Sequence, residues 1–348
     1  MDIEYRSGLL YNRVLKRYKH LSKWARRRGI DAFRIYDRDI PEIPLTIDIY
    51  KNIITLAWYA RRGGGENALF VDAYRKAVSS AVCIPEHDII VIERARKHHK
   101  GGEAAQYEKI NAAARTVTAA EYGARFRVKP GAYLDSGLFL DARGCRNLIG
   151  KSAANKRLLN LFCYTASFSV AAALGGAAET CSVDLSNTYL NWARENFTLN
   201  GLSAEKFQNA RQAFESGKKT NLLIRADCTR FIDECIEKKY IWDIIIVDPP
   251  VFSNSKKMNG IFDIQRDYQN MLNSCARLLH KDGSLFFSVK GGGLKTGALD
   301  DFLICDITEK VRDEDFIKKR IPRWYMAQSA LPGSAALSPL QNSLQSPV

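Results

Sequence analysis

Acidic residues follow three short apolar segments of the sequence. Asp184, Asp227 and Asp248 each come directly after such a segment, where a strand of a parallel sheet would end. Open α/β sheets bind their ligands at the carboxyl ends of their strands, and in dinucleotide folds an acid after the second strand accepts hydrogen bonds from ribose hydroxyls. One such acid is often only a helix cap, but three at equivalent positions predict a nucleoside-binding site.

The third of these acids opens the segment Asp-Pro-Pro-Val-Phe-Ser-Asn-Ser, residues 248–255. Pro249 and Pro250 remove backbone donors and stiffen the chain where the strand leaves its sheet. They would present Phe252 at the edge of the site, and the competing interpretation is an aromatic side chain packed within a loop. The segment is typical of an enzyme that holds a planar group beside a reactive cofactor.

The turn after the first predicted strand indicates the kind of cofactor. It reads Asn-Leu-Phe-Cys-Tyr-Thr-Ala-Ser, residues 160–167, and lacks the G-x-G-x-x-G pattern that lets a backbone approach a pyrophosphate. A nucleoside cofactor without phosphates fits this turn better, and S-adenosylmethionine is the obvious candidate. Asp227 and Cys228 are placed to meet its adenine amino group.

Alternating strand and helix patterns position these residues. From residue 125 onward they predict a mostly parallel, doubly wound α/β sheet of the Rossmann-like kind, with helices on both faces. The charged residues 202–220 are expected to form a surface loop. We expect four regions: a basic N-terminal helix at 1–30, a small α+β domain at 31–124, the doubly wound domain at 125–327, and a disordered tail rich in Ser, Pro, Gln and Ala at 328–348.

The charge of the chain points to a polyanionic partner. The formal net charge is +14, and residues 1–30 hold nine Lys or Arg against two acids. Arg26, Arg27 and Arg28 are the candidates for RNA contact, and a second basic segment follows at residues 94–100. The competing interpretation is a basic face that only contacts solvent.

Other classes of protein are disfavoured. The eight cysteines and five histidines show no metal-ligand spacing, so no metal is expected, and the thiols are interpreted as reduced. No apolar segment is long enough to span a membrane and no leader pattern opens the chain, which predicts a cytoplasmic location without membrane contact.

Several segments resemble class I methyltransferases that act on ribosomal RNA. The most similar group is the RlmK half of the bacterial bifunctional large-subunit rRNA methyltransferase K/L, a guanine-N7 methyltransferase. The segments that carry the resemblance are residues 160–165, 183–186, 189–193, 226–228 and 248–255, with further support from 23–26, 35–42, 106–109 and 134–143.

The resemblance implies a class I methyltransferase fold, S-adenosylmethionine as cofactor, and large-subunit rRNA as substrate. Asp184, with Leu185 and Ser186, is assigned to the ribose hydroxyls, and Asp227 and Cys228 to adenine. The other implied cofactor contacts are Ser136, Gly137, Asp141, Arg143, Asn160, Phe162, Tyr164 and Thr165. Arg143 would pair with the methionine carboxylate, and the alternative for it is an ion pair on a helix surface.

The catalytic assignments fall in the Asp-Pro-Pro segment. Asp248 and Pro249 would lie beside the methyl group, and Phe252 would stack on a flipped guanine, whose edge Asn254 and Ser255 would bind.

The acceptor atom is inferred from a missing nucleophile. Guanine N7 offers a lone pair without a proton, so its methylation requires positioning and electrostatics but no general base. A pyrimidine C5 methyltransferase needs a cysteine that attacks the ring. Relatives of that kind carry it near the end of the fourth or fifth strand, where this chain has Ser253 and Ser288. A nitrogen acceptor is therefore favoured.

Departures from the family pattern keep alternatives open. Ala166 stands where a glycine is usual, and residues 290–293 replace a sequence that usually contains Asn. The L half, with its THUMP RNA-binding domain, is missing, so RNA capture is expected from residues 1–125 or from a separate THUMP-containing partner. The alternatives are methylation of cytosine C5 or guanine N2, and an RNA-binding relative without catalysis.

Overall fold

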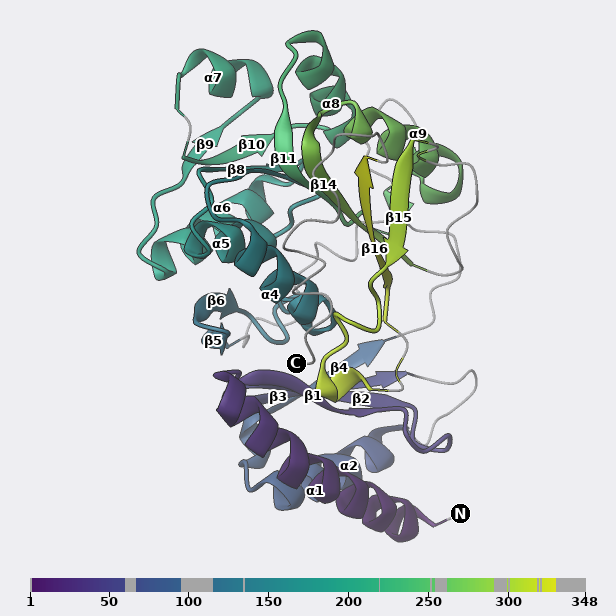
Figure 1. Cartoon of the computed structure of the whole chain (residues 1–348). Helices are drawn as coiled ribbons and strands as arrows, with labels where there is room; N and C mark the ends of the chain where they lie inside the picture. The colour runs from purple at the N-terminus through teal and green to yellow at the C-terminus, as the bar shows by residue number, and fades with distance from the viewer. Residues whose placement is uncertain are drawn as a thin grey trace. The chain divides into compact units, whose positions relative to one another are not determined.

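The chain forms two compact units, which are described separately (Figure 1). Unit 1 contains Met1–Leu140 together with Asp313–Lys319, and unit 2 contains Asp141–Arg312 together with Arg320–Val348. In the part of the chain that is described, no helix is long and apolar enough to cross a membrane. The computed structural model describes residues 2–59, 67–94, 115–133, 135–218, 220–250, 252–253, 262–290, 299, 301–317, 319 and 321–329.

Unit 1 is built on a four-stranded sheet with the order β1-β2-β3-β4. The first three strands are antiparallel, and β4 runs parallel to β3 because α2 connects the two. Helices α1 and α2 share a core with this sheet. The bounds are α1 (Ile3–Arg28), β1 (Ala32–Asp37), β2 (Leu45–Tyr50), β3 (Ile53–Tyr59), α2 (Asn67–Val82), a 3-10 turn (Glu86–Asp88), β4 (Ile89–Arg94), and the hairpin β5 (Val117–Glu121) and β6 (Ala124–Val128).

Helix α1 is amphipathic and ends at a glycine. Leu10, Val14 and Leu21 recur at helical spacing and are fully buried in the core of unit 1. Gly29 has a left-handed backbone with φ of 64°, and its N–H donates to the carbonyl of Arg26 at 3.3 Å. Glycine adopts this conformation without steric cost, which is why the helix ends there. The structure thus places this helix within the residues 1–30 expected from the sequence.

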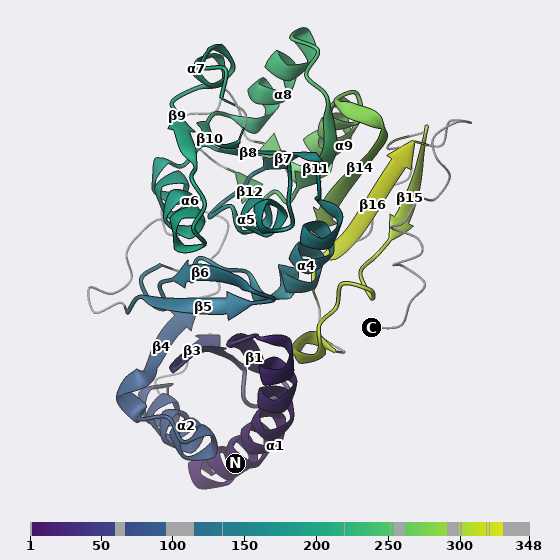
Figure 2. The same ribbon diagram turned by 60° about the vertical axis from the view of Figure 1, so that its left-hand side comes forward.

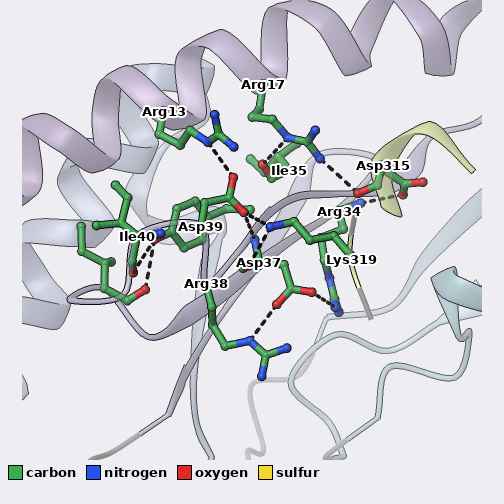
Figure 3. Close-up of polar contacts among 12 residues, drawn as sticks. Arg13, Arg17, Arg34, Ile35, Asp37, Arg38, Asp39, Ile40, Asp315 and Lys319 are labelled. Atoms are coloured by element: carbon green, nitrogen blue, oxygen red, sulfur yellow. Dashed lines mark hydrogen bonds and ion pairs between the residues drawn. The ribbon is translucent and has the colours of Figure 1, made fainter. Parts of the chain in front are cut away.

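The segment Asp313–Lys319 belongs to unit 1 although it lies late in the chain (Figure 3). Asp315 is fully buried, and its carboxylate accepts the backbone N–H of Arg34 at 3.0 Å. The guanidinium of Arg34 lies over the ring of Phe316, 5.2 Å from its centroid. From α1, Arg17 donates to the carbonyl of Asp315 at 3.1 Å. These contacts anchor the segment.

A second part of this polar network surrounds Asp39, whose side chain is only 2% exposed. Arg13 of α1 pairs with it at 2.6 Å, and Lys319 contacts its other oxygen (Figure 3). Burial acts to raise the pKa of Asp39, but the hydrogen bonds from Lys319 and Arg13 outweigh it and hold the pKa below its usual value. The carboxylate is therefore charged and doubly paired.

Unit 2 is built on an eight-stranded sheet with the order β15-β16-β14-β11-β7-β8-β10-β9. The six strands from β14 to β9 are parallel, and β16 is antiparallel to both of its neighbours. The bounds are α4 (Arg143–Ser152), β7 (Arg157–Leu161), α5 (Ser167–Leu174), β8 (Glu179–Asp184), α6 (Asn187–Leu199), β9 (Glu205–Phe207), α7 (Ala210–Glu215), β10 (Asn221–Arg225), α8 (Cys228–Glu237), β11 (Trp242–Val247), β12 (Phe252–Ser253), β13 (Phe262–Asp263), α9 (Ile264–Ala276), β14 (Leu279–Val289), β15 (Phe302–Asp306) and β16 (Arg323–Ser329).

Alternate residues of the central strands enter two different cores. Leu158 of β7 packs with residues of α4 and α5, whereas Leu159 packs with residues of α8 and α9. Ile244 and Ile245 of β11 divide in the same way. Figures 1 and 2 show these two pairs of helices on opposite faces of the sheet. Strands covered on both faces are mostly apolar, and the predicted doubly wound fold is confirmed.

The segment at residues 202–220 was predicted as a loop, and that prediction was wrong because the segment contains β9 and α7. Ala210 and Ala213 of α7 are buried in the same core as β10. Asn209 caps this helix by accepting the N–H of Gln212 at 2.9 Å. The charged residues Arg211 and Glu215 of this helix concealed its short apolar face.

The units also differ from the expected domain boundaries. The basic helix shares the core of unit 1 and is not a separate region. Unit 1 extends to Leu140 rather than ending at residue 124, since the hairpin β5–β6 is bonded to it: the N–H of Ala120 donates to the carboxylate of Asp31 at 2.5 Å. Of the predicted tail, residues 330–348 lie outside the described residues.

Candidate active site

The topology of unit 2 places a candidate site at one edge of its sheet. From β7 the chain adds β8 and then β10 on one side, and then crosses to add β11 on the other side of β7. The carboxyl ends of β7 and β11 therefore flank the topological switch point, where open α/β sheets bind ligands. Asp184 ends β8, Asp227 follows β10 and Asp248 follows β11, so the three acids lie along this edge.

The turn between β7 and α5 has a strained backbone. Phe162, Tyr164 and Ala166 have φ values of 54°, 53° and 56°, a region that side chains of these types rarely adopt. Each such residue costs on the order of 1–3 kcal/mol, and such residues concentrate at functional sites. One contact that holds the turn is the N–H of Cys163, which donates to the carbonyl of Val183 at 3.0 Å.

Asp184 connects this turn to the start of α6. One carboxylate oxygen accepts the N–H of Tyr164 at 2.9 Å, and the other accepts the N–H of Ser186 at 2.8 Å. Ser186 itself caps α6 by accepting the N–H of Tyr189 at 3.3 Å. A carboxylate has about four acceptor positions, so these bonds, together with one from the N–H of Leu185, still leave capacity on Asp184 for a hydroxyl donor.

The environment of Asp184 changes its ionisation. Burial raises the pKa of Asp184 to about 6, although hydrogen bonds from the N–H groups of Ser186, Tyr164 and Leu185 favour the charged form. The charged form is thus costly to maintain in the protein alone. Such an arrangement is typical of a carboxylate that meets a ligand.

Three other assigned residues fix the same turn. The amide of Asn160 is buried and donates to the hydroxyl of Ser169 at 2.9 Å. Thr165 is fully buried, and its carbonyl accepts the side-chain amide of Asn196 at 2.9 Å. The ring of Tyr164 packs edge-on against the ring of Tyr189, with 4.4 Å between centroids. These contacts hold the turn in its strained form.

Asp227 and Cys228 begin α8 at the end of β10. The carboxylate of Asp227 accepts the N–H groups of Thr229 and Arg230 at 3.0 and 3.1 Å, so it caps the helix. The sulfur of Cys228 accepts the N–H of Phe162 at 3.3 Å. This contact joins the turn after β7 to the turn after β10.

Asp248 lies in a small polar network at the end of β11. It accepts a hydrogen bond from the hydroxyl of Ser288, and Lys290 lies 3.2 Å from the same oxygen. Lys290 also donates to the carbonyl of Pro249 at 3.1 Å, and Tyr268 donates to the carbonyl of Ser288 at 2.6 Å. The sequence showed a changed segment at Lys290 but not its ion pair with Asp248.

Some of the predicted site residues either lack a described side chain or belong to unit 1. The side chain of Phe252 is not described, and Asn254 and Ser255 lie outside the described residues. Ser136 and Gly137 belong to unit 1, where the hydroxyl of Ser136 donates to that of Tyr50 at 2.7 Å. The predicted residues of unit 2 that are described lie along one edge of its sheet. The roles assigned to Phe252, Asn254, Ser255, Ser136 and Gly137 stay predictions.

Residues 94–322 match the family of S-adenosylmethionine-dependent methyltransferases. The chain belongs to this family. It is 42% identical over 322 residues to "Ribosomal RNA large subunit methyltransferase K" of Neisseria meningitidis, covering 90% of this chain and 84% of that protein. It is 40% identical over 281 residues to "Ribosomal RNA large subunit methyltransferase K/L" of Shewanella loihica, covering 80% of this chain but only 36% of that longer protein. The resemblance inferred from the motifs is confirmed.

Solved structures of methyltransferases agree with the fold. A putative SAM-dependent methyltransferase from Streptococcus mutans aligns with a TM-score of 0.68 at 22% identity, covering 94% of this chain and 81% of that one. A putative methyltransferase complexed with SAH aligns with a TM-score of 0.65 at 25% identity, covering 94% and 82%. The expected class I methyltransferase architecture is thereby confirmed.

The described residues of this methyltransferase fit its cofactor, S-adenosylmethionine. The free acceptor positions of Asp184 suit ribose hydroxyls. The turn after β7 carries the side chains of Phe162 and Tyr164 where a dinucleotide fold needs glycines for a pyrophosphate, which suits a cofactor without phosphates.

Helix α4 contributes buried charge near the start of unit 2. Arg143 is fully buried, so the alternative of an ion pair on a helix surface was wrong for it. Arg146, one turn later, is also buried, and its guanidinium lies 5.9 Å from the ring centroid of Phe168. Asp141 precedes this helix and is partly buried. Two buried guanidinium groups therefore lie at i and i+3 of α4, and only Arg143 was expected from the sequence to bind the cofactor.

Proposed function

We propose that this methyltransferase transfers a methyl group to guanine N7 in large-subunit ribosomal RNA. The relatives named as large-subunit rRNA methyltransferase K and K/L support the substrate, and the relative named K is covered over 84% of its length. The observation that carries the activity is the carboxylate of Asp184, held by two backbone N–H groups at the carboxyl end of β8.

Asp184, with Leu185 and Ser186, binds the ribose, and the start of α8 binds adenine through Asp227 and the backbone N–H of Cys228. The hydrogen bond from the N–H of Phe162 to the sulfur of Cys228 joins the turn after β7 to the turn after β10. The other proposed cofactor contacts in unit 2 are Asn160, Phe162, Tyr164 and Thr165, with Asp141 and Arg143 around the methionine group. When bound, the cofactor supplies an electrophilic sulfonium methyl.

The acceptor is held beside Asp248 and Pro249. The ion pair of Lys290 with Asp248 keeps this strand end in one geometry, which supports methyl transfer by positioning. Phe252 stacks on the base, and Asn254 and Ser255 bind its edge. Because guanine N7 has no proton to lose, the residues need only orient the base and exclude water.

The state of the thiols supports a nitrogen acceptor. Burial raises the pKa of Cys163 and of Cys228 well above the usual value, so both are protonated at neutral pH. A protonated thiol packed beneath a turn is a poor nucleophile for a pyrimidine ring. Near the end of β14, where a catalytic cysteine could stand, this chain has Ser288, whose hydroxyl donates a hydrogen bond to Asp248.

RNA capture is assigned to unit 1, including Arg26, Arg27 and Arg28, and the protein is assigned to the cytoplasm. A separate THUMP-containing partner stays a prediction.

A direct test uses purified protein, S-adenosylmethionine and 23S rRNA transcribed in vitro, followed by digestion to nucleosides and mass spectrometry. We expect 7-methylguanosine, and none with Asp184→Ala. 5-Methylcytidine or N2-methylguanosine in the product would contradict the acceptor, and unmodified RNA would contradict the activity.

A further inference from the structure

Eight of the nine Lys and Arg residues of α1 divide into two sets with different surroundings. Arg13 and Arg17 turn into the network that anchors Asp313–Lys319 (Figure 3). Arg6 lies over the ring of Phe70, 5.2 Å from its centroid. These three guanidinium groups therefore have partners inside unit 1, and their charge contributes to its structure.

The second set, which we call the α1 stripe, consists of Lys16, Lys19, Lys23, Arg26 and Arg27. All five are exposed, and none forms an ion pair with any residue that the structure describes. Their spacing of i, i+3, i+7 and i+10 or i+11 puts them on one side of the helix.

The composition of this side is uniform. From Asn12 to Arg27, the exposed residues of α1 are only Asn, Arg, Lys and His, with no acid and no apolar side chain among them. Cores of protein interfaces are enriched in aromatic residues and depleted of charge. The α1 stripe lacks such anchors, so it suits a charged polymer better than a protein surface.

The spacing of charge along the stripe matches a nucleic acid strand. Eleven residues separate Lys16 and Arg27, which corresponds to about 16 Å along the helix axis. Five cations over this length give about one positive charge for each 3–4 Å, and one strand of a duplex carries one phosphate for about each 3.4 Å. The helix therefore offers a line of cations at the density of a phosphate backbone.

We propose that the α1 stripe is the surface on which this methyltransferase docks the phosphate backbone of its RNA substrate. This inference rests on the proposed function in its choice of RNA. It changes the assignment made from the sequence: Lys16, Lys19 and Lys23 join Arg26 and Arg27, whereas Arg28 is partly buried and points about 100° or more away from the centre of the stripe. Contacts of this kind position an RNA without reading its sequence.

The test compares two triple variants of the full chain with equal net charge. One is Lys16→Gln/Lys19→Gln/Lys23→Gln, and the control is Lys151→Gln/Lys238→Gln/Lys281→Gln, which removes three exposed lysines of unit 2. Binding to a fluorescently labelled 23S rRNA transcript is measured by anisotropy over a series of salt concentrations. The affinity of each variant for S-adenosylmethionine is measured by calorimetry to confirm that its fold is intact.

We expect the stripe variant to reduce the slope of log affinity against log salt by about 2–3, about one for each lysine, and the control to leave it unchanged. Arg28→Gln should also leave the slope unchanged, whereas Arg27→Gln should reduce it by about one.

Three results would overturn the proposal: an unchanged slope in the stripe variant, an equal loss in the control, or equally effective competition by poly-glutamate, which would indicate an acidic protein partner. A product other than 7-methylguanosine with a reduced slope would contradict the proposed acceptor and leave the docking surface intact.

Discussion

The unusual ionisation of Asp184 leads to opposite effects of pH on cofactor binding and on stability. Ribose hydroxyls donate to the charged carboxylate, so binding requires Asp184 to lose its proton. With a pKa of about 6, about nine-tenths of the carboxyl is protonated at about pH 5 and almost none at about pH 7.5. The Kd for S-adenosylmethionine should therefore be about tenfold higher at the lower pH, which equals about 1.4 kcal/mol.

Stability of the protein without cofactor should change in the other direction. The pKa of Asp184 is raised in the folded state from its ordinary value of 3.8, so the folded chain retains a proton that the unfolded chain has lost. Between these two pKa values, the free energy of unfolding falls as pH rises. The full penalty is at most about 3 kcal/mol above pH 6, since solvent around this partly exposed residue screens it. About half of it develops between about pH 5 and pH 7.5.

Two assays with one matched variant check this prediction. Titration calorimetry at several pH values gives the Kd, and urea unfolding at the same pH values gives the stability. Asp184→Asn, which cannot ionise, should bind weakly at every pH and should lack both trends. The reasoning would be refuted if the wild-type Kd stayed constant over this range, or if the variant showed the same pH dependence as the wild type.

Three further substitutions test the buried ion pair of unit 1, the strained turn of unit 2 and the positioning of Asp248. Lys319→Met leaves the buried carboxylate of Asp39 with Arg13 as its one cationic partner and should lower the urea-unfolding free energy by about 3 kcal/mol. The stability should recover when Asp39→Asn is added, and no recovery would mean that the loss comes only from altered packing. Ala166→Val should lower the free energy of unfolding by about 3 kcal/mol, because a β-branched residue does not fit a left-handed backbone at a fully buried position. Ala166→Gly should stay within about 1 kcal/mol of the wild type. Similar unfolding midpoints for the two variants would contradict the strained turn. Lys290→Met should lower kcat about tenfold at saturating RNA by releasing Asp248, with most of the activity restored in Lys290→Arg; an effect on KM alone would argue against positioning.

The sequence predicted the fold of unit 2 because its strands carry two independent signals. The central strands hold short apolar runs such as Leu222–Ile224 and Ile244–Val247, and the strands β8, β10 and β11 lead into the acids Asp184, Asp227 and Asp248. The cap at Ser186 and the helix end at Gly29 were also predictable, because both depend on residues adjacent in sequence. Local chemistry of this kind can be inferred without knowing what packs against it.

Features that depend on distant residues were not predictable in the same way. Nothing in residues 313–319 indicates that Asp315 and Lys319 would meet Arg34 and Asp39 across nearly the whole chain length. The short face of α7 was masked by its charges, since Ala210 and Ala213 alone give no clear period. Long-range ion pairs and short, weakly patterned elements depend on tertiary packing, which one sequence does not display.

The most direct test of guanine-N7 methylation uses the chemistry of the product. 7-Methylguanosine in RNA is reduced by borohydride, and aniline then cleaves the chain at that nucleotide. We predict that 23S rRNA incubated with this protein and S-adenosylmethionine is cut at a defined guanosine, and that RNA incubated with Asp184→Ala is not cut. RNA that has gained a methyl group and remains intact after this treatment would contradict the account.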